Sequence, residues 1–198
     1  MTTKAFDTQK LVLLAILTAI VIALQILAIV TRLFLPMFSL TLVLVPIVTG
    51  AALIGIYAGA WLGLVFGFAV LISGDANIFL GINFPGTIIV VLLKGLLAGF
   101  AAGVVYKLIN RFNRTIAVFA AAIVCPLVNT GIFILGCYIF FLPELTHEAI
   151  LAGAASVTAF IFFIMIGVNF LIEFGVNIVL SPSIVRLIQY RRDLKTKS

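Results

Sequence analysis

Charged residues are scarce in this chain, at 9% of 198 residues, while 65% are hydrophobic. A soluble domain is about half apolar and about a quarter charged. No soluble core of this length can bury so much apolar surface, so the composition excludes a soluble domain. The apolar runs are also continuous rather than short and alternating, which predicts membrane-spanning helices and not a barrel.

Residues that commonly bind metals or catalyse reactions are also scarce. One histidine, His147, and two widely separated cysteines, Cys125 and Cys137, exclude a metal cluster. The phosphate-binding sequence G-x-x-x-x-G-K-[ST] does not occur, and no Ser/His/Asp arrangement is indicated by the spacing. We therefore expect a protein that is not an enzyme and that holds neither a metal nor a cofactor.

The apolar runs predict an all-α membrane protein of one domain with six transmembrane helices. The break between the second and third helices is expected near residues 55–60, where Gly-Ile-Tyr-Ala-Gly can turn. Residues 74–85 are expected to form an external loop, and residues 186–198 a basic tail. The expected helices cover residues 11–30, 38–55, 59–73, 86–106, 115–142 and 155–180.

Basic residues are unevenly distributed along the chain. If the helices alternate in direction, ten basic residues fall on one side of the membrane, at both chain ends and in the loop after the fourth helix. Arg32 falls on the opposite side, with Asp75, Glu144 and Glu148. Because basic residues mark the cytoplasmic side, we expect both termini in the cytoplasm. The tail is interpreted as an anchor facing anionic lipid rather than as a binder of nucleic acid.

One lysine, Lys94, lies inside the fourth predicted helix. A charge at this depth costs several kcal/mol unless it is paired or hydrated, so Lys94 is a functional candidate. Its expected partner is Glu173, which shares one face of the sixth helix with Asn169 and Asn177. Two interpretations stay open: an ion pair that fixes two helices, or an ammonium group that binds an anionic ligand.

Asn129 is a further candidate. Pro126, on the same predicted helix, removes a backbone hydrogen bond, and broken helices near the membrane midplane often bind small solutes. The alternative is a kinked helix in which Asn129 forms a hydrogen bond to a neighbouring helix.

The expected external loop, residues 74–85, carries Phe79, Asn83 and Phe84. It can act as a lid, with the two aromatic rings closing over a ligand and Asn83 supplying hydrogen bonds. The alternative is an ordinary surface loop with an aromatic interface anchor.

Small residues recur at a spacing of four on two of the predicted helices. Gly95, Gly99 and Gly103 give the fourth helix one flat face, which predicts close packing against a neighbouring helix inside the protein. Ala15 and Ala19 form a similar pair on the first helix, where the spacing permits another helix to dock.

The chain resembles the S-components of energy-coupling factor (ECF) transporters, small membrane proteins that capture vitamins. The six predicted helices and the Ala15-x-x-x-Ala19 pair are similar to that family. More specific are three segments that resemble the branch containing pantothenate carriers: SLTLVLVPIVTGAALIG (39–55), AGAWLGLVFG (58–67) and INFPGTIIVVLLKGLLAG (82–99).

The resemblance implies a subunit of the bacterial plasma membrane that binds its vitamin from outside. A transmembrane coupling subunit and two cytoplasmic ATPases would then complete uptake. Ala15 and Ala19 match the motif that contacts the coupling subunit. Residues 74–85 would form the gate over the ligand, and Phe79 and Phe84 are its expected gate residues. For pantothenate, Lys94 or Arg32 would meet the carboxylate. Asn83, Asn129, Asn169 and Glu173 complete the predicted site.

The sequence leaves other functions open. Within the same class they are a carrier of hydroxymethylpyrimidine, pyridoxine or another vitamin. From other classes they are a ligand-free membrane scaffold and a self-sufficient secondary transporter. The sequence shows no convincing internal repeat to support the last.

Overall fold

A computed structural model describes residues 8–34 and 42–197. These residues form helices and short connections, with no strand among them. The first seven helices along the chain are α1 (Thr8–Phe34), α2 (Leu44–Leu53), α3 (Ile56–Ile72), α4 (Asn77–Ile82), α5 (Phe84–Asn110), α6 (Arg114–Phe140) and α7 (Leu142–Leu151). The chain ends with α8 (Val157–Ala159), the π-helix η1 (Phe160–Ile166) and α9 (Gly167–Lys197).

The apolar helices are those of a multi-pass membrane protein. Within the described residues, three segments are long and apolar enough to cross a membrane: Thr8–Val30 of α1, α5 and α6. Two shorter apolar helices are α2 and α3. The all-α fold is therefore as predicted. Six crossings and cytoplasmic termini stay predictions, and residues 38–41 of the second predicted helix lie outside the described residues.

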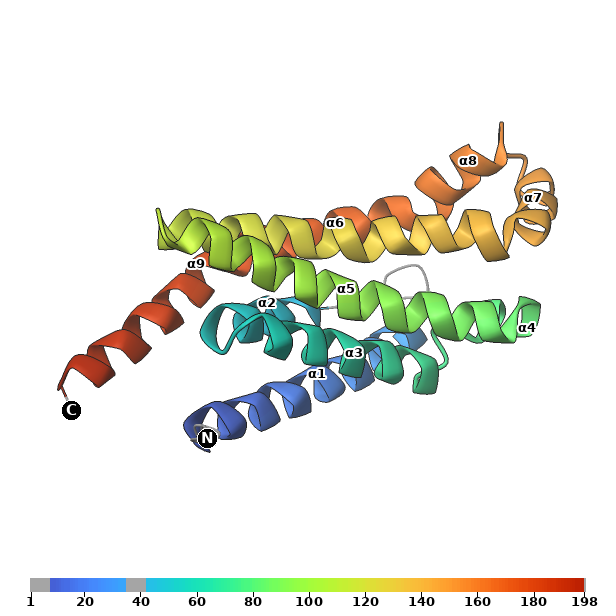
Figure 1. Cartoon of the computed structure of the whole chain (residues 1–198). Helices are drawn as coiled ribbons and strands as arrows, with labels where there is room; N and C mark the ends of the chain where they lie inside the picture. Colours follow the sequence, from blue (N-terminus) through green and yellow to red (C-terminus); the bar gives the residue numbers. More distant parts are fainter. Residues whose placement is uncertain (1–7, 35–41, 198) are drawn as a thin grey trace, which may run out of the picture.

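The helices pack side by side around α5 (Figure 1). On one side, α5 packs against α6, which in turn packs against α9; on the other side it packs against α3, which α1 covers. The start of α1, the end of α9 and the junction between α5 and α6 lie at one end of the bundle. The short helices α4 and α7 lie at the opposite end. We call these the basic end and the lid end.

Glycines from both helices bring the backbones of α3 and α5 into contact. A Cβ atom on Gly63 would overlap the carbonyl oxygen of Gly95, and one on Gly95 would overlap that of Gly63. Gly59 and Gly99 face each other in the same way. The predicted internal role of the glycine face on the fourth helix is therefore confirmed, and the contact fixes the turn of α5 that follows Lys94.

The break between α2 and α3 lies at Gly55, the first residue of the predicted segment 55–60, and α3 begins at Ile56 rather than at residue 59. Gly55 has a φ of 138°, which side-chain-bearing residues rarely adopt, so the chain can reverse direction there without strain. Other features were not expected from the sequence: α4 lies inside residues 74–85, α7 follows α6, and α9 continues as a helix through most of the basic tail. These segments are short or polar, so no long apolar run in the sequence marks them.

Candidate functional site

Lys94 lies on α5, next to the close contact with α3. At 1.5 Å per residue it is about 15 Å from the start of the helix, or half the hydrocarbon thickness of a bilayer. Its side chain is half-buried. The charge therefore lies near the middle of a helix that is long and apolar enough to cross a membrane.

Two aromatic rings lie against the Lys94 ammonium group. Its Nζ atom is 5.2 Å from the centre of the Phe133 ring on α6 and 5.9 Å from that of Phe66 on α3. A cation within about 6 Å of a ring face is attracted by the π electrons. Three helices thus each contribute one side chain to the site.

Glu173, on α9, acts electrostatically on Lys94. The structure therefore brings the two predicted partners into the same region, from two helices that both pack against α6. In the part of the chain that the structure describes, no hydrogen bond or ion pair reaches the Lys94 ammonium nitrogen. Its attractive contacts are the two rings and the field of Glu173, so hydrogen-bonding positions on the ammonium group are available to a ligand.

Two further rings extend this aromatic cluster toward the lid end. Phe79 on α4 meets Phe133 edge-on, with ring centres 5.4 Å apart, and its centre is 5.0 Å from that of Phe141. This is the favourable T-shaped geometry for the first pair. The segment predicted as a lid thus places a ring on the ring that contacts Lys94.

Asn129 lies on α6 one turn from Phe133 and on the same face. Its side chain is 6% exposed, and its Oδ1 atom has no hydrogen-bond partner among the described residues. Buried polar atoms are nearly always paired, so this oxygen is suited to accept a hydrogen bond from a ligand. Because α6 continues through Pro126, the site is formed on an unbroken helix.

Buried polar side chains continue along α9 from Glu173. The Asn177 amide nitrogen donates to the backbone carbonyl of Glu173 at 2.8 Å, and the Ser181 hydroxyl donates to that of Asn177 at 2.8 Å. Both side chains are buried. These bonds stay within one helix and satisfy the Asn177 amide nitrogen and the Ser181 hydroxyl, whereas the Asn177 Oδ1 atom has no hydrogen-bond partner among the described residues.

The sequence matches the family described as "ECF transporter, substrate-specific component" over residues 9–185. The chain belongs to this family. No curated protein and no solved structure matches it. Such S-components are transporter subunits rather than enzymes. They bind a small-molecule substrate and work with a membrane coupling subunit and ATPases.

The other predicted site residues of this S-component are placed differently. Asn83 caps the start of α5, where its Oδ1 atom accepts a hydrogen bond from the Gly86 backbone at 3.0 Å, so only its amide nitrogen is left for a ligand. Phe84 is 63% exposed in the first turn of α5. Arg32 lies in α1 and Asn169 in α9. The side chains of Arg32 and Asn169 are outside the described part of the structure.

Ala15 and Ala19 of the S-component are exposed on α1. Large apolar side chains surround them on the same surface, including Ile16 and Ile20. This face is therefore accessible to another membrane helix.

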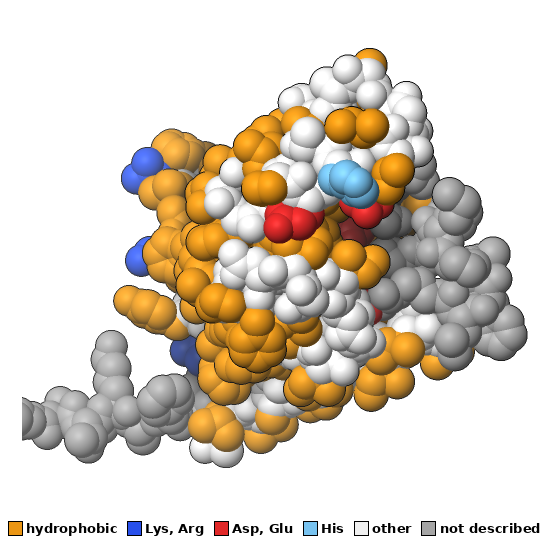
Figure 2. All heavy atoms as spheres, turned by 90° about the vertical axis from the view of Figure 1, so that its right-hand side faces the viewer, with side chains coloured by type: hydrophobic (Ala, Val, Ile, Leu, Met, Phe, Trp, Pro, Cys, Tyr) orange, Lys and Arg blue, Asp and Glu red, His pale blue; other side chains and the backbone are white. Residues whose placement is uncertain are grey.

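The lid end and the basic end carry opposite charges. Figure 2 looks onto the lid end and shows acidic side chains beside the single histidine. Glu144, His147 and Glu148 are exposed there on α7. Lys107 and Arg111 are exposed at the other end of α5.

Sequence analysis did not identify Phe66, Phe133 or Phe141 as parts of the site. Phe133 lies four residues after Asn129, and residues at this spacing share one face of a helix. The sequence therefore contains a signal that places Phe133 beside Asn129. No comparable signal marked Phe66, because α3 is apolar on all sides.

Proposed function

We propose that this S-component binds a vitamin anion, with pantothenate as the substrate, between α3, α5, α6 and α9. One observation carries the proposal: the ammonium group of the half-buried Lys94 contacts the Phe66 and Phe133 rings near the middle of an apolar helix, without an ion pair in the described residues. A ligand carboxylate would supply the charge-assisted hydrogen bonds that the rings do not.

Other polar groups of the site fit the remainder of such a ligand. Pantothenate has hydroxyl groups and an amide that can donate hydrogen bonds. The unpaired Oδ1 atom of Asn129 is a suitable acceptor. We propose that Asn169, Asn83 and Arg32 provide further contacts and that Glu173 orients Lys94.

Phe79 and Phe84 are proposed to close the external entrance. Phe79 supports this role because it packs on Phe133 and Phe141 from the lid end. Phe84 would have to turn inward from its exposed position.

The proposed orientation follows from the charges of the two ends. The basic end, with both the start of α1 and the end of α9, would face the cytoplasm of a bacterium. The lid end would then receive substrate from outside. Ala15 and Ala19 are proposed to contact the coupling subunit, which works with two ATPases.

Carriers of hydroxymethylpyrimidine or pyridoxine are the second candidates. Glu173 favours them, because its carboxylate can balance Lys94 within the site and leave no net charge for an anion to meet. The identity of the vitamin therefore depends on how strongly Glu173 and a ligand compete for the same ammonium group.

Calorimetry on the full chain in detergent tests the proposal. Wild-type protein, Lys94→Met and Lys107→Met would be titrated with pantothenate, pyridoxine and hydroxymethylpyrimidine. Lys107 is the matched control, because it is an exposed lysine on the same helix. We expect tight pantothenate binding that Lys94→Met weakens at least tenfold and that Lys107→Met leaves unchanged, as for loss of a charge-assisted contact.

The outcomes separate the alternatives. Pantothenate affinity that survives in a folded Lys94→Met protein would return Lys94 to a structural role. Tight binding of only an uncharged or cationic vitamin would overturn the pantothenate assignment and keep the carrier function.

A further inference from the structure

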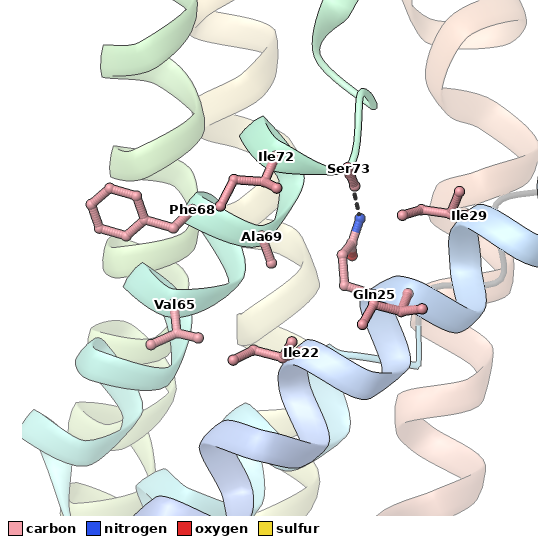
Figure 3. A pocket seen from close by; sticks show the side chains of 9 residues that line it. Ile22, Gln25, Ile29, Val65, Phe68, Ala69, Ile72 and Ser73 are labelled. Carbon is pink, nitrogen blue, oxygen red and sulfur yellow. Dashed lines mark hydrogen bonds between the residues drawn. The ribbon is translucent and has the colours of Figure 1, made fainter.

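A buried polar contact joins α1 to the segment that leads into α4. The Gln25 side chain on α1 is 1% exposed. Its Nε2 atom donates to the Ser73 hydroxyl at 3.1 Å (Figure 3). The same atom donates to the Asp75 carboxylate oxygen Oδ2 at 2.6 Å. The two acceptors lie between the end of α3 and the start of α4.

These hydrogen bonds join a helix to residues about fifty positions away in the chain. Bonds to a carboxylate are stronger than neutral ones, and this one is short. We call the contact between Gln25, Ser73 and Asp75 the α1 clasp.

The α1 clasp borders a cavity. A space of about 290 Å³ lies between α1 and α3, with Gln25 and Ser73 in its wall and apolar side chains, such as Ile26 and Phe68, in the remainder. The Gln25 Oε1 atom has no hydrogen-bond partner in the described residues. The clasp is therefore incompletely satisfied and loosely packed on one side, which favours a contact that can open.

The residues that follow the α1 clasp reach the candidate site directly. Ala76, next to Asp75, is buried, and α4 begins one residue later. Its Phe79 ring packs on Phe133, whose ring contacts Lys94. Three contacts thus connect Gln25 with the ammonium group through α4: the clasp, the Phe79–Phe133 pair and the contact of Phe133 with Lys94.

We propose that Gln25 is a positioning residue for the lid: by holding Asp75 and Ser73 it keeps α4 and Phe79 closed over the site. This inference rests on the proposed substrate site. It adds that α1, the helix with the exposed Ala15 and Ala19, controls the lid. Movement of α1 away from α3 breaks the α1 clasp and frees α4.

A hydrogen bond between α1 and α3 themselves provides a control. The Trp61 indole nitrogen donates to the Thr18 hydroxyl at 3.3 Å. Thr18 lies seven residues before Gln25, about 10 Å nearer the basic end, where α4 does not reach. Loss of this bond also loosens α1 from α3 but does not touch the lid.

Hydrogen–deuterium exchange on the full chain in lipid nanodiscs, without ligand, tests the α1 clasp. The informative amides are those of Leu80 and Asn83, which donate to the Ala76 and Phe79 carbonyls. We expect Gln25→Leu to speed their exchange about tenfold, the size of effect expected for losing a hydrogen bond to a charged group. Thr18→Val should leave both amides as in the wild type.

A second variant and a second measurement complete the test. If Gln25→Leu does not fold, Gln25→Asn replaces it, because the shorter side chain withdraws the amide from Asp75. The dissociation rate of bound vitamin should rise by a similar factor in the Gln25 variant and not in Thr18→Val.

Unchanged exchange of Leu80 and Asn83 in a folded Gln25 variant overturns the inference. Equal acceleration in the Gln25 and Thr18 variants also overturns it, because general loosening of α1 would then explain the effect. Absence of vitamin binding in the wild type would refute the proposed function instead, and the exchange result would still decide on the clasp.

Discussion

The ammonium nitrogen of Lys94 lies 5.2 Å from the centre of the Phe133 ring, so a charge on α5 is held by an aromatic face on α6. The same ring receives the edge of Phe79 from α4. Phe133 is therefore shared by the charge and by the lid. Changes to this ring should affect both substrate affinity and the closure of the site.

Phe133→Leu should weaken vitamin binding about fivefold to thirtyfold. The substitution keeps an apolar side chain but removes the ring that positions the Lys94 ammonium group and supports Phe79, an effect of about 1–2 kcal/mol. Phe112→Leu is the control, because Phe112 pairs with Arg111 at 4.7 Å near the basic end, outside the site. Calorimetry on both variants checks the prediction, and equal affinities would contradict it.

Glu173→Gln should raise the affinity for an anionic vitamin about fivefold. The carboxylate acts on Lys94, and its removal leaves the ammonium group to the ligand alone, a gain of about 1 kcal/mol. If the pair serves only to fix packing, the variant would instead lower the melting temperature and leave affinity unchanged. Measuring both quantities on the same preparation distinguishes the two roles of Glu173.

Asn129→Leu should weaken binding without destabilising the empty protein. The Oδ1 atom of Asn129 is buried and unpaired in the described residues, so replacing it removes a desolvation cost of about 1–3 kcal/mol. A ligand that donates to this atom would lose a hydrogen bond. Melting curves with and without vitamin test this, and a large fall in stability without ligand would indicate a structural hydrogen bond instead.

Gly63→Ala should destabilise the protein by about 1–3 kcal/mol, the cost typical of overpacking, because the new Cβ atom would overlap the Gly95 carbonyl oxygen. Gly131→Ala is the matched control on α6, where a Cβ atom meets nothing within 4 Å. It should be neutral or stabilising by up to about 1 kcal/mol. Thermal unfolding in detergent compares the two, and equal melting temperatures would show that α3 and α5 can separate freely.

Ala15→Leu with Ala19→Leu should abolish vitamin uptake while preserving vitamin binding. Both residues are exposed, so the larger side chains fit in the isolated S-component but prevent close approach of another helix. Co-purification with the coupling subunit should fall at least about tenfold, a change equal to about 1.4 kcal/mol. Unchanged co-purification would place the coupling surface elsewhere on the protein.

The sequence by itself determined the class of protein. A chain that is 65% hydrophobic and 9% charged can bury its surface only in a bilayer, and continuous apolar runs there must be helical to satisfy the backbone. Composition also singled out Lys94, because a buried charge is costly wherever the helix lies. The glycine spacing on the fourth predicted helix likewise indicated close packing before any partner was known.

Only the tertiary structure decided what surrounds Lys94. Phe66 and Phe133 come from different helices, and both contact Lys94 because the Gly63–Gly95 contact and the α5–α6 packing set the register of α3, α5 and α6. Apolar side chains of a membrane helix can face either the lipid or the protein interior, so the sequence alone does not show which of them point inward. The α1 clasp could not be predicted from the sequence for a related reason. Gln25 and Asp75 lie far apart in the chain, and only packing of α1 on α3 brings them together.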